Sequence, residues 1–274
     1  MIELPEVYVL ADQINKELKG KMIVQAEAGH SPHAFAWYTG NPAEYNSKLA
    51  GKKVVSADVF SGSIRVRAGD MILLITTPIR FHKTGDKVPD KHQLYLKFED
   101  GTSITCTIQM WGSLFCFADG DLNGIPDKYV LSRNLSPLEE EFNESYYNSL
   151  LQEGKTLSLS AKAFLATEQR IPGIGNGAAQ DILFTAKIHP RRKMSALSES
   201  EQKVLFRAIK DVIADMWKKG GRDTENDLYG CRGGYKTILS KNTVNKPCPV
   251  CGTIIKKENY LGGSIYFCKE CQSL

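Results

Sequence analysis

The stretch CPVCGTIIKKENYLGGSIYFCKEC, residues 248–271, decides how the end of this chain folds. It holds two Cys-x-x-Cys pairs, Cys248 with Cys251 and Cys268 with Cys271, separated by 16 residues. Four thiolates at this spacing can surround Zn²⁺ tetrahedrally, because each pair supplies two ligands from one tight turn. Protein fills all four positions, which indicates a structural zinc and not a catalytic one. The alternative, two disulfides, is disfavoured because the sequence carries no secretory signal.

The residues between the two pairs are predicted to form a β-hairpin. Gly252–Ile255 and Ser264–Phe267 have the alternation of two strands, and Lys256 and Lys257 follow the first of them. The remaining three cysteines are spaced unlike metal ligands and are predicted to be ordinary thiols.

Before the hairpin the hydrophobic period is helical. Helices are predicted over Phe142–Glu153, Ser158–Thr167, Gly177–Ala186 and Ser198–Lys219. The third follows Gly173-Ile174-Gly175-Asn176. Small residues such as Gly173 and Gly175 allow backbone N–H groups at a helix start to approach a phosphate, and Asn176 could add a side-chain donor. The alternative is that Asn176 only caps the helix.

The first part of the chain predicts one helix and then many short strands. Residues 4–19 place Val7, Leu10, Ile14 and Leu18 near one helix face. Strands separated by turn signals then predict an antiparallel sandwich or barrel, at Ile23-Val24, Lys53–Phe60, Ser63–Arg67, Met71–Thr76, Gln93–Phe98, Ser103–Met110 and Ser113–Phe117.

The sequence therefore predicts an α+β protein in four parts. An N-terminal helix and β-sandwich occupy residues 1–118, and a linker follows at 119–141. A helical domain occupies residues 142–228, and the zinc hairpin 229–274.

Composition limits the functional classes. A hydrophobic fraction of 42% and a charged fraction of 24% are ordinary for a globular protein. No apolar run is long enough for a membrane helix, so we expect a cytoplasmic protein without a membrane partner. The net charge of +4 is uneven: residues 1–154 carry −5 and residues 155–274 carry +9. A basic second half suits a polyanion such as DNA, although a solvated surface would look the same.

The chain opens with Met1-Ile2-Glu3-Leu4-Pro5-Glu6. This opening, with the cysteine quartet, resembles the formamidopyrimidine-DNA glycosylase and endonuclease VIII family, whose members begin Met-Pro-Glu-(Leu/Gly)-Pro-Glu. The stretch Lys162–Pro190 resembles that family's helix-two-turns-helix, and Leu135-Ser136-Pro137-Leu138 its linker. The order of these elements covers nearly the whole chain. The resemblance implies a monomeric DNA-repair protein that binds duplex DNA at an abasic or damaged site.

The resemblance also implies catalytic roles at the N-terminus. Glu3 matches the family's proton-shuttling carboxylate and Glu6 its second acidic residue, although both could instead be charges that favour a helix start. The family's nucleophile is the proline amine exposed by removal of Met, and Ile2 replaces that proline. Ile2 should also block Met removal, so the free amine would belong to Met1, displaced by about 3.4 Å.

Other family positions differ as well. In the resemblance the family's strand lysine falls at Gly62 and its hairpin arginine at Gly263, and the aromatic just after the matching Asn is replaced by Gly177-Ala178-Ala179. The loop that fills the hole left by an everted base corresponds to Gln109-Met110-Trp111-Gly112, where Trp111 is either a wedge in the base stack or a core aromatic. Basic residues near the two DNA-binding elements are Lys256, Lys257, Lys236, Lys241, Lys246 and Arg191-Arg192-Lys193.

Three functions follow from this sequence. The first is a DNA-binding protein of the base excision repair family that recognises damage, with its catalytic activity in doubt. The second is an active divergent glycosylase and abasic-site lyase that uses the Met1 amine and Glu3. The third is a structural zinc-ribbon protein that binds RNA or a protein partner.

Overall fold

The computed structural model describes residues 1–121, 125 and 135–274, which form two compact units. Unit 1 contains Met1–Ile2, the described residues between 6 and 125, and Glu225–Gly233. Unit 2 contains Glu3–Pro5, residues 135–224 and Gly234–Leu274. Residues 122–124 and 126–134 of the predicted linker lie outside the described residues. Among the described helices, none combines the length and apolar character needed to span a bilayer.

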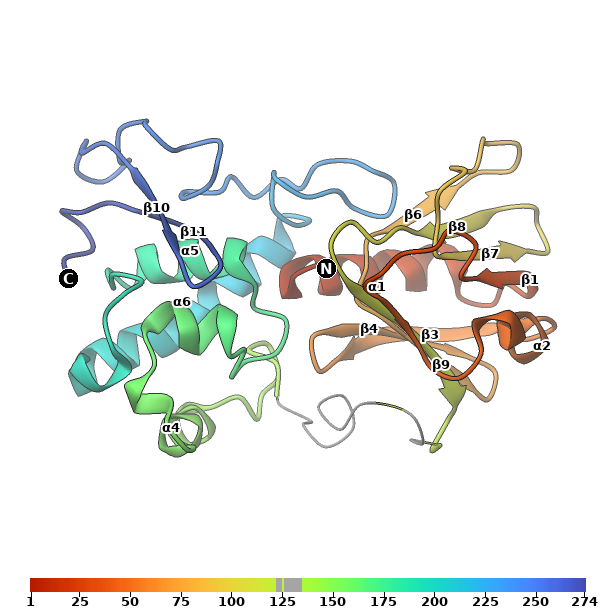
Figure 1. Cartoon of the computed structure of the whole chain (residues 1–274), viewed down its shortest axis with the longest axis horizontal. Coiled ribbons are helices and arrows are strands. Elements are labelled where there is room, and N and C mark those ends of the chain that lie inside the picture. Colours follow the sequence, from red (N-terminus) through yellow and green to blue (C-terminus); the bar gives the residue numbers. More distant parts are fainter. Residues whose placement is uncertain (122–124, 126–134) are drawn as a thin grey trace. The chain divides into compact units, whose positions relative to one another are not determined.

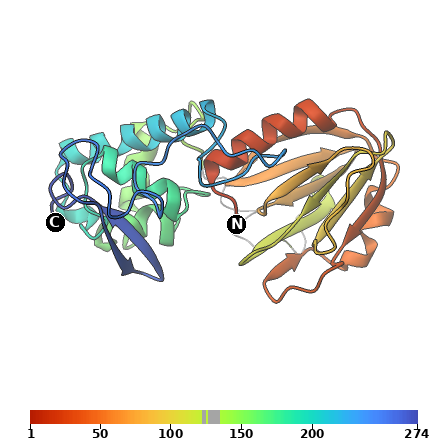
Figure 2. The ribbon, with the colours of Figure 1, turned by 90° about the horizontal axis from the view of Figure 1, so that it is seen from above.

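Unit 1 is a two-layer β-sandwich with α1 (Leu4–Leu18) along one side (Figures 1 and 2). One sheet has the order β1-β7-β8-β6, and the other β2-β9-β5-β4-β3. A short turn of helix and α2 (Tyr45–Leu49) follow β2. The strands are β1 (Ile23–Ala28), β2 (Ala36–Tyr38), β3 (Val54–Phe60), β4 (Ser63–Ala68), β5 (Met71–Ile75), β6 (Ile79–His82), β7 (Leu94–Phe98), β8 (Ser103–Cys106) and β9 (Gly112–Ala118).

The apolar face of α1 fills the sandwich core, as its sequence pattern predicts. Val7, Leu10, Ile14 and Leu18 are all buried in one cluster with residues of both sheets. Burying a side chain of this size contributes roughly 1.5–3 kcal/mol. Ile2 joins the same cluster and is 6% exposed.

One strand pair in the sandwich is parallel and was not predicted. Strand β2 runs parallel to β9, with Trp37 opposite Ser113, whereas the other pairs of named strands are antiparallel. The first residue of β9 is Gly112, where a Cβ would overlap the Thr77 side chain. Because β2 and β9 run parallel, the segments that precede them lie at the same end of this strand pair.

Unit 2 is helical and ends in a two-stranded hairpin beside α5 (Figure 1). Together with unit 1 it confirms the predicted α+β fold class. Its elements are α4 (Glu144–Gln152), a 3₁₀ turn (Thr156–Ser158), a π-helical turn (Ala163–Thr167), α5 (Asn176–Thr185), a 3₁₀ turn (Met194–Ala196), α6 (Glu199–Lys218), β10 (Lys256–Tyr260) and β11 (Gly263–Phe267).

Two predicted elements of unit 2 were wrong in their limits. The continuous helix predicted over Ser158–Thr167 is broken, because the Ala161 and Lys162 N–H groups donate to Arg192 and Pro190 carbonyls instead of to a preceding helical turn. The first hairpin strand begins at Lys256 and not at Gly252. The residues before it form the cysteine turn, in which the Cys248 N–H donates to the Thr253 carbonyl.

Helix α6 begins with a capping box that gives a testable prediction. The Ser198 side chain accepts from the Glu201 N–H, and Glu201 in turn accepts from Ser198 and Arg192. These bonds, above all the one from Arg192, lower the pKa of Glu201 to about 2. We expect Ser198→Ala to lower the free energy of unfolding by about 1 kcal/mol.

The same box should make stability depend on pH. A carboxyl whose pKa is lowered on folding stabilises above its unfolded pKa, and this contribution is lost as pH falls toward the folded value. Glu201→Gln should therefore be less stable than the parent at pH 7. The difference should narrow between pH 4.5 and 2 in denaturant titrations. A difference that stays constant through that range would contradict the assignment.

Candidate functional site

The carboxylate of Glu3 lies at the start of helix α5, within unit 2. Its Oε1 accepts from the Gly177 N–H at 2.9 Å, and its Oε2 accepts from the Ala178 N–H at 2.8 Å. Arg222 Nη1 lies 3.2 Å from Oε2. A negative charge is favourable at a helix N-terminus, where N–H groups lack helical partners. Glu3 therefore takes the place at α5 that a bound anion would otherwise occupy.

Two glycines make room for this arrangement. A Cβ on Gly175 would overlap the Glu3 carboxyl carbon, and a Cβ on Gly177 would overlap Arg222 Nη1. The backbone at these positions is not left-handed, so it is space and not conformation that requires glycine. Position 177 is where the family has an aromatic. Here the Arg222 guanidinium fills that space.

Arg222 contacts Glu3 in this candidate site, although no sequence motif predicted it there. It is 3% exposed and follows Gly220-Gly221 at the end of α6. The sequence signal for it was a cationic residue directly after the glycine pair that ends a helix. A buried charge requires a partner, because desolvation of an unpaired ion costs several kcal/mol. The Glu3 carboxylate is such a partner.

A second buried carboxylate, Asp181, ties α5 to the chain before the hairpin. Its two oxygens accept from the Ile238 and Leu239 N–H groups at 2.9 and 2.7 Å. Burial raises the pKa of Asp181 to about 6, although these hydrogen bonds and the charge of Arg222 act in the opposite direction. The segment that leads into the cysteine hairpin is thus held by a helix side chain that is itself fully buried.

Near the N-terminus, Ile2 is bound to unit 1 by both its backbone and its side chain. Its N–H donates to the Thr76 carbonyl at 3.0 Å, and its side chain is in the sandwich core. A proline at this position, joined to a preceding residue, would have no N–H to donate. Glu6, also in unit 1, is 3% exposed. The catalytic roles of Met1, Glu3 and Glu6 stay predictions.

The glycine-rich turn and the hairpin meet within unit 2. The Gly173 carbonyl accepts from the Leu4 N–H at 2.7 Å, and Gly173 has φ of +79°, which glycine adopts without strain. Asn176 begins α5 and donates through Nδ2 to the Ser264 carbonyl of β11 at 2.7 Å. Asn176 is thus bonded to the hairpin, while Gly175 takes the cap position of α5.

Lys162 brings a cation beside Gly263, which the resemblance predicts to correspond to the family's hairpin arginine. A Cβ on Gly263 would lie 3.4 Å from Lys162 Nζ and 3.6 Å from Asn176 Nδ2. Lys162 is 4% exposed, donates to the Tyr260 carbonyl, and lies over the Tyr260 ring. Burial lowers its pKa from the ordinary value for lysine. Since an ammonium has three N–H donors, this contact does not exhaust its hydrogen-bonding capacity.

The four cysteines predicted as ligands come together and could hold a metal ion. All four Sγ atoms lie within 4.8 Å of one another. Cys248 Sγ is 3.8 Å from Cys271 Sγ, and Cys251 Sγ is 3.4 Å from Cys268 Sγ. The inner pair, Cys248 and Cys268, packs with Phe184 of α5 in a small apolar cluster. Lys256 and Lys257 are exposed on β10.

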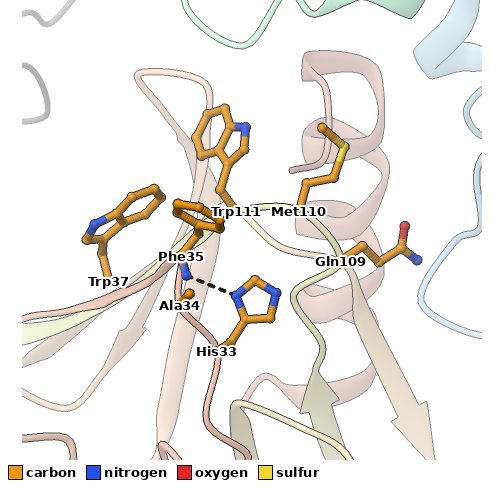
Figure 3. A pocket seen from close by; sticks show the side chains of 7 residues that line it. All are labelled: His33, Ala34, Phe35, Trp37, Gln109, Met110 and Trp111. Carbon is orange, nitrogen blue, oxygen red and sulfur yellow. Dashed lines mark hydrogen bonds between the residues drawn. The ribbon is translucent and has the colours of Figure 1, made fainter.

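The loop Gln109–Gly112 lies in unit 1, at the start of β9 (Figure 3). Trp111 is half-buried, and its ring meets the Trp37 ring edge to face, with centroids 6.0 Å apart. Trp111 is therefore not a fully buried core aromatic. Gly62, at the family's lysine position, has φ of +74° in the turn between β3 and β4.

Both a central segment and the chain as a whole are similar to known proteins. The sequence profile described as the formamidopyrimidine-DNA glycosylase H2TH domain matches residues 134–226. The chain is 27% identical over 288 residues to formamidopyrimidine-DNA glycosylase of Lactobacillus delbrueckii, covering 99% of both chains. It is 26% identical to the enzyme of the same name from Mycoplasma mobile, covering 100% of both. The similarity to named formamidopyrimidine-DNA glycosylases thus extends over the whole chain, in agreement with the predicted family.

Solved structures share the fold of this family. The MutM (Fpg) protein of Thermus thermophilus superposes with a TM-score of 0.80 at 23% identity, covering 98% of each chain. Lactococcus lactis Fpg, solved as a complex with DNA containing an abasic site, gives a TM-score of 0.82 at 22% identity and covers 99% of this chain and 100% of that one. The fold of the whole chain is therefore that of these solved structures.

Proposed function

We propose that this protein is a DNA-binding member of base excision repair that recognises an abasic or otherwise damaged site in duplex DNA. The observation that carries the proposal is that the similarity to named DNA glycosylases extends over 99% of the chain, including both units. The Lactococcus relative binds DNA that contains an abasic site.

Chemical features of unit 2 support a DNA partner. Residues 155–274 carry +9, and phosphate contacts by lysine and arginine release counterions and so favour binding. Lys162 and Asn176 place two nitrogen donors beside Gly263. Small size at Gly263 leaves this position open to a phosphate oxygen. Lys256 and Lys257 add exposed charge on the neighbouring strand.

Zinc is the metal that the four cysteines fit. Thiolates at about 2.3 Å from a tetrahedral Zn²⁺ stand about 3.8 Å from one another. The Cys248–Cys271 and Cys251–Cys268 Sγ separations of 3.8 and 3.4 Å are compatible with that geometry. A site of four cysteines has no open position, so the metal would stabilise the hairpin that carries Lys256 and Lys257 and take no part in a reaction.

Recognition without base removal is the form of the function that we favour, because Ile2 replaces the proline amine. The Ile2 side chain is in the core of unit 1 and its N–H is bonded to Thr76, so this residue serves the fold. Glu3, the residue that matches the family's proton-shuttling carboxylate, is present. It therefore supports a second candidate function, a lyase that uses the Met1 amine. An α-amine with an ordinary pKa near 7.7–8 is partly neutral at physiological pH and can attack a sugar carbonyl carbon.

Binding is tested with three labelled nucleic acids of equal length: a duplex with one abasic analogue, the undamaged duplex, and single-stranded RNA. We expect fluorescence anisotropy to show tighter binding to the abasic duplex, with affinity that falls steeply as salt rises. Equal, weak binding to both duplexes together with tighter binding to RNA would replace the proposal with a zinc-ribbon RNA-binding protein.

Catalysis is tested separately on a duplex that contains a true abasic site. Borohydride traps a Schiff base as a covalent adduct, and intact mass shows whether Met1 is retained. We expect binding but neither adduct nor strand cleavage at long times. An adduct that disappears when the N-terminal amine is acetylated would instead establish the Met1 lyase.

The Lys162 ammonium beside Gly263 gives a further prediction. Lys162→Gln should weaken binding to damaged and undamaged duplexes by a similar factor, and it should reduce the slope of log affinity against log salt by about one. The measurement is a salt series by anisotropy. Lys87→Gln, an exposed lysine in unit 1, is the matched control. A slope that matches the parent would exclude Lys162 from the phosphate contact.

A further inference from the structure

A second cluster of metal-ligating side chains lies in unit 1, whereas the four cysteines belong to unit 2. Glu27, His30 and His92 each offer one ligand atom, and these three atoms all lie within 4.8 Å of one another. Glu27 is on β1, His30 follows that strand, and His92 precedes β7. We call these three residues the histidine cluster.

Backbone pairing holds the two histidines of the cluster side by side. Strands β1 and β7 are neighbours in the four-stranded sheet (Figure 1). Beyond β1, the Gly29 N–H donates to the Gln93 carbonyl at 2.8 Å, and the Ser31 N–H donates to the His92 carbonyl at 3.0 Å. The imidazole rings of His30 and His92 stack with centroids 4.4 Å apart and planes 7° from parallel. The ligand atoms are therefore brought together by the fold itself.

His92 has the hydrogen bonding of a metal ligand. Its Nδ1 lies 2.9 Å from the Pro89 carbonyl oxygen. Because a carbonyl only accepts, Nδ1 carries the proton, and the neutral ring has its lone pair on Nε2. His92 is 6% exposed, and among residues 1–121, 125 and 135–274 its Nε2 has no hydrogen-bond partner. Metal-ligating histidines usually donate their other N–H in this way, to a backbone carbonyl or a carboxylate.

The carboxylate of Glu27 lies between the two histidines. Its Oε1 is 2.8 Å from His30 Nδ1, and its Oε2 is 3.9 Å from His92 Nε2. An ion pair with His30 explains the first contact. The second is too long for a hydrogen bond and leaves the buried lone pair of His92 unused.

Small movements would let all three residues bind one ion. Ligand atoms at about 2.0–2.1 Å from a tetrahedral ion stand about 3.3 Å apart. The Glu27 and His92 ligand atoms would therefore approach by about half an ångström from their separation of 3.9 Å. The side chains of His30 and Glu27 are 43% and 44% exposed, so they have room to move.

Two imidazoles and one carboxylate select the class of metal. Magnesium and calcium prefer sites made of oxygen ligands, whereas imidazole suits zinc, copper, nickel and iron. Three protein ligands also leave a coordination position for water, unlike the closed set of four thiolates in unit 2.

We propose that Glu27, His30 and His92 form a second metal site, which binds Zn²⁺ or a similar divalent transition ion and keeps one coordination position open to solvent. The ion takes the place of the proton that His30 and Glu27 share. It joins the loop after β1 to the segment before β7 through side chains as well as backbone. This site is independent of the proposed DNA-binding function.

The test is a zinc titration of the whole protein. The chain is purified with zinc in the cysteine quartet, and weakly held metal is removed with a mild chelator. Calorimetric titration with zinc chloride should then show one further ion per chain. Because loss of even an outer partner weakens metal binding about 10- to 100-fold, His30→Ala and Glu27→Gln should each weaken it about 100-fold or more. His33→Ala changes a histidine of the same loop outside the cluster and should bind as the parent does.

Cobalt distinguishes this site from the cysteine quartet by its spectrum. Co²⁺ held by nitrogen and oxygen gives weak visible bands, whereas cysteine ligands add an intense ultraviolet charge-transfer band. The further Co²⁺ should give the visible bands without the charge-transfer band, and Glu27→Gln should remove them. Hydrogen exchange of the Gly29 and Ser31 amides should slow when the metal is added, because the ion joins the two segments that these amides connect.

Three results would overturn the inference. The first is a parent protein that binds no further ion. The second is binding that persists in both His30→Ala and Glu27→Gln. The third is an equal loss in His33→Ala, which would show an adventitious ion only, shared among surface histidines. The two ligand variants change partly exposed side chains, and circular dichroism equal to that of the parent separates loss of metal from loss of fold. Failure of DNA binding would leave this inference unchanged.

Discussion

Removing the metal from the cysteine site is expected to unfold the C-terminal hairpin and to abolish DNA binding. Four of the five residues of β10 are exposed, and β11 buries only Ile265 and Phe267, so little apolar burial holds the hairpin together. Structural zinc contributes on the order of 10 kcal/mol to the folding of small modules of this kind. Hydrogen exchange before and after chelation should show loss of protection in residues 247–272, and the anisotropy signal of the abasic duplex should fall to that of free DNA.

The controls for this prediction lie in the chain itself. Cys268→Ser should reproduce the effect of chelation, because Cys268 is a fully buried member of the quartet. Cys231→Ser changes an exposed cysteine of unit 1 and should leave both metal content and hairpin protection unchanged. Mass spectrometry of the native protein should find one zinc per chain. Full hairpin protection in metal-free protein would disprove the structural role.

Replacing Gly177 by alanine is expected to destabilise unit 2 strongly, against the usual preference of helices. Alanine in a helix interior normally stabilises by up to about 1 kcal/mol relative to glycine. Here its Cβ would overlap the Arg222 guanidinium and lie 3.0 Å from Glu3 Oε1. Arg222 is long enough to move away, but it would leave the partly buried carboxylate of Glu3. Breaking such a pair costs about 3–5 kcal/mol, which should appear in denaturant unfolding.

A double-mutant cycle isolates the cause. Arg222→Ala should itself cost about 3–5 kcal/mol, since it leaves Glu3 with only its two backbone donors. In that background Gly177→Ala should become neutral or stabilising, because the space is then empty. The coupling between the two positions should exceed about 2 kcal/mol. Simple additivity of the two losses would show that Arg222 does not occupy the space beside Gly177.

Local patterns predicted much of the fold. The alternation of β3, β4, β5 and β9 and the periods of α1 and α6 located these elements to within a few residues. The parallel pairing of β2 was not predictable, because a three-residue strand has too little pattern to show its partner. The break at Leu159-Ser160 was missed for a related reason: the N–H groups of the next two residues, Ala161 and Lys162, are bonded to carbonyls about 30 residues along the chain.

The residues of the candidate site likewise differ in whether the sequence could predict them. The cysteine quartet could be predicted because ligand spacing is a local property of the sequence. Glu3 could be predicted only through the family resemblance, and its partners on α5 are 174 and 175 residues away. Arg222 gave no signal strong enough to single it out.

Local patterns in the sequence were enough to predict the α+β class, the cysteine quartet and the resemblance to the glycosylase family, because these depend on periodicity, spacing and the order of motifs. Only the tertiary structure decided what replaces the missing family residues. It places Arg222 where the aromatic would be, brings Lys162 Nζ to Gly263, and buries Ile2 in the sandwich core. Each of these results from contacts between residues far apart in the chain, and such contacts follow from packing and charge pairing that no local pattern records.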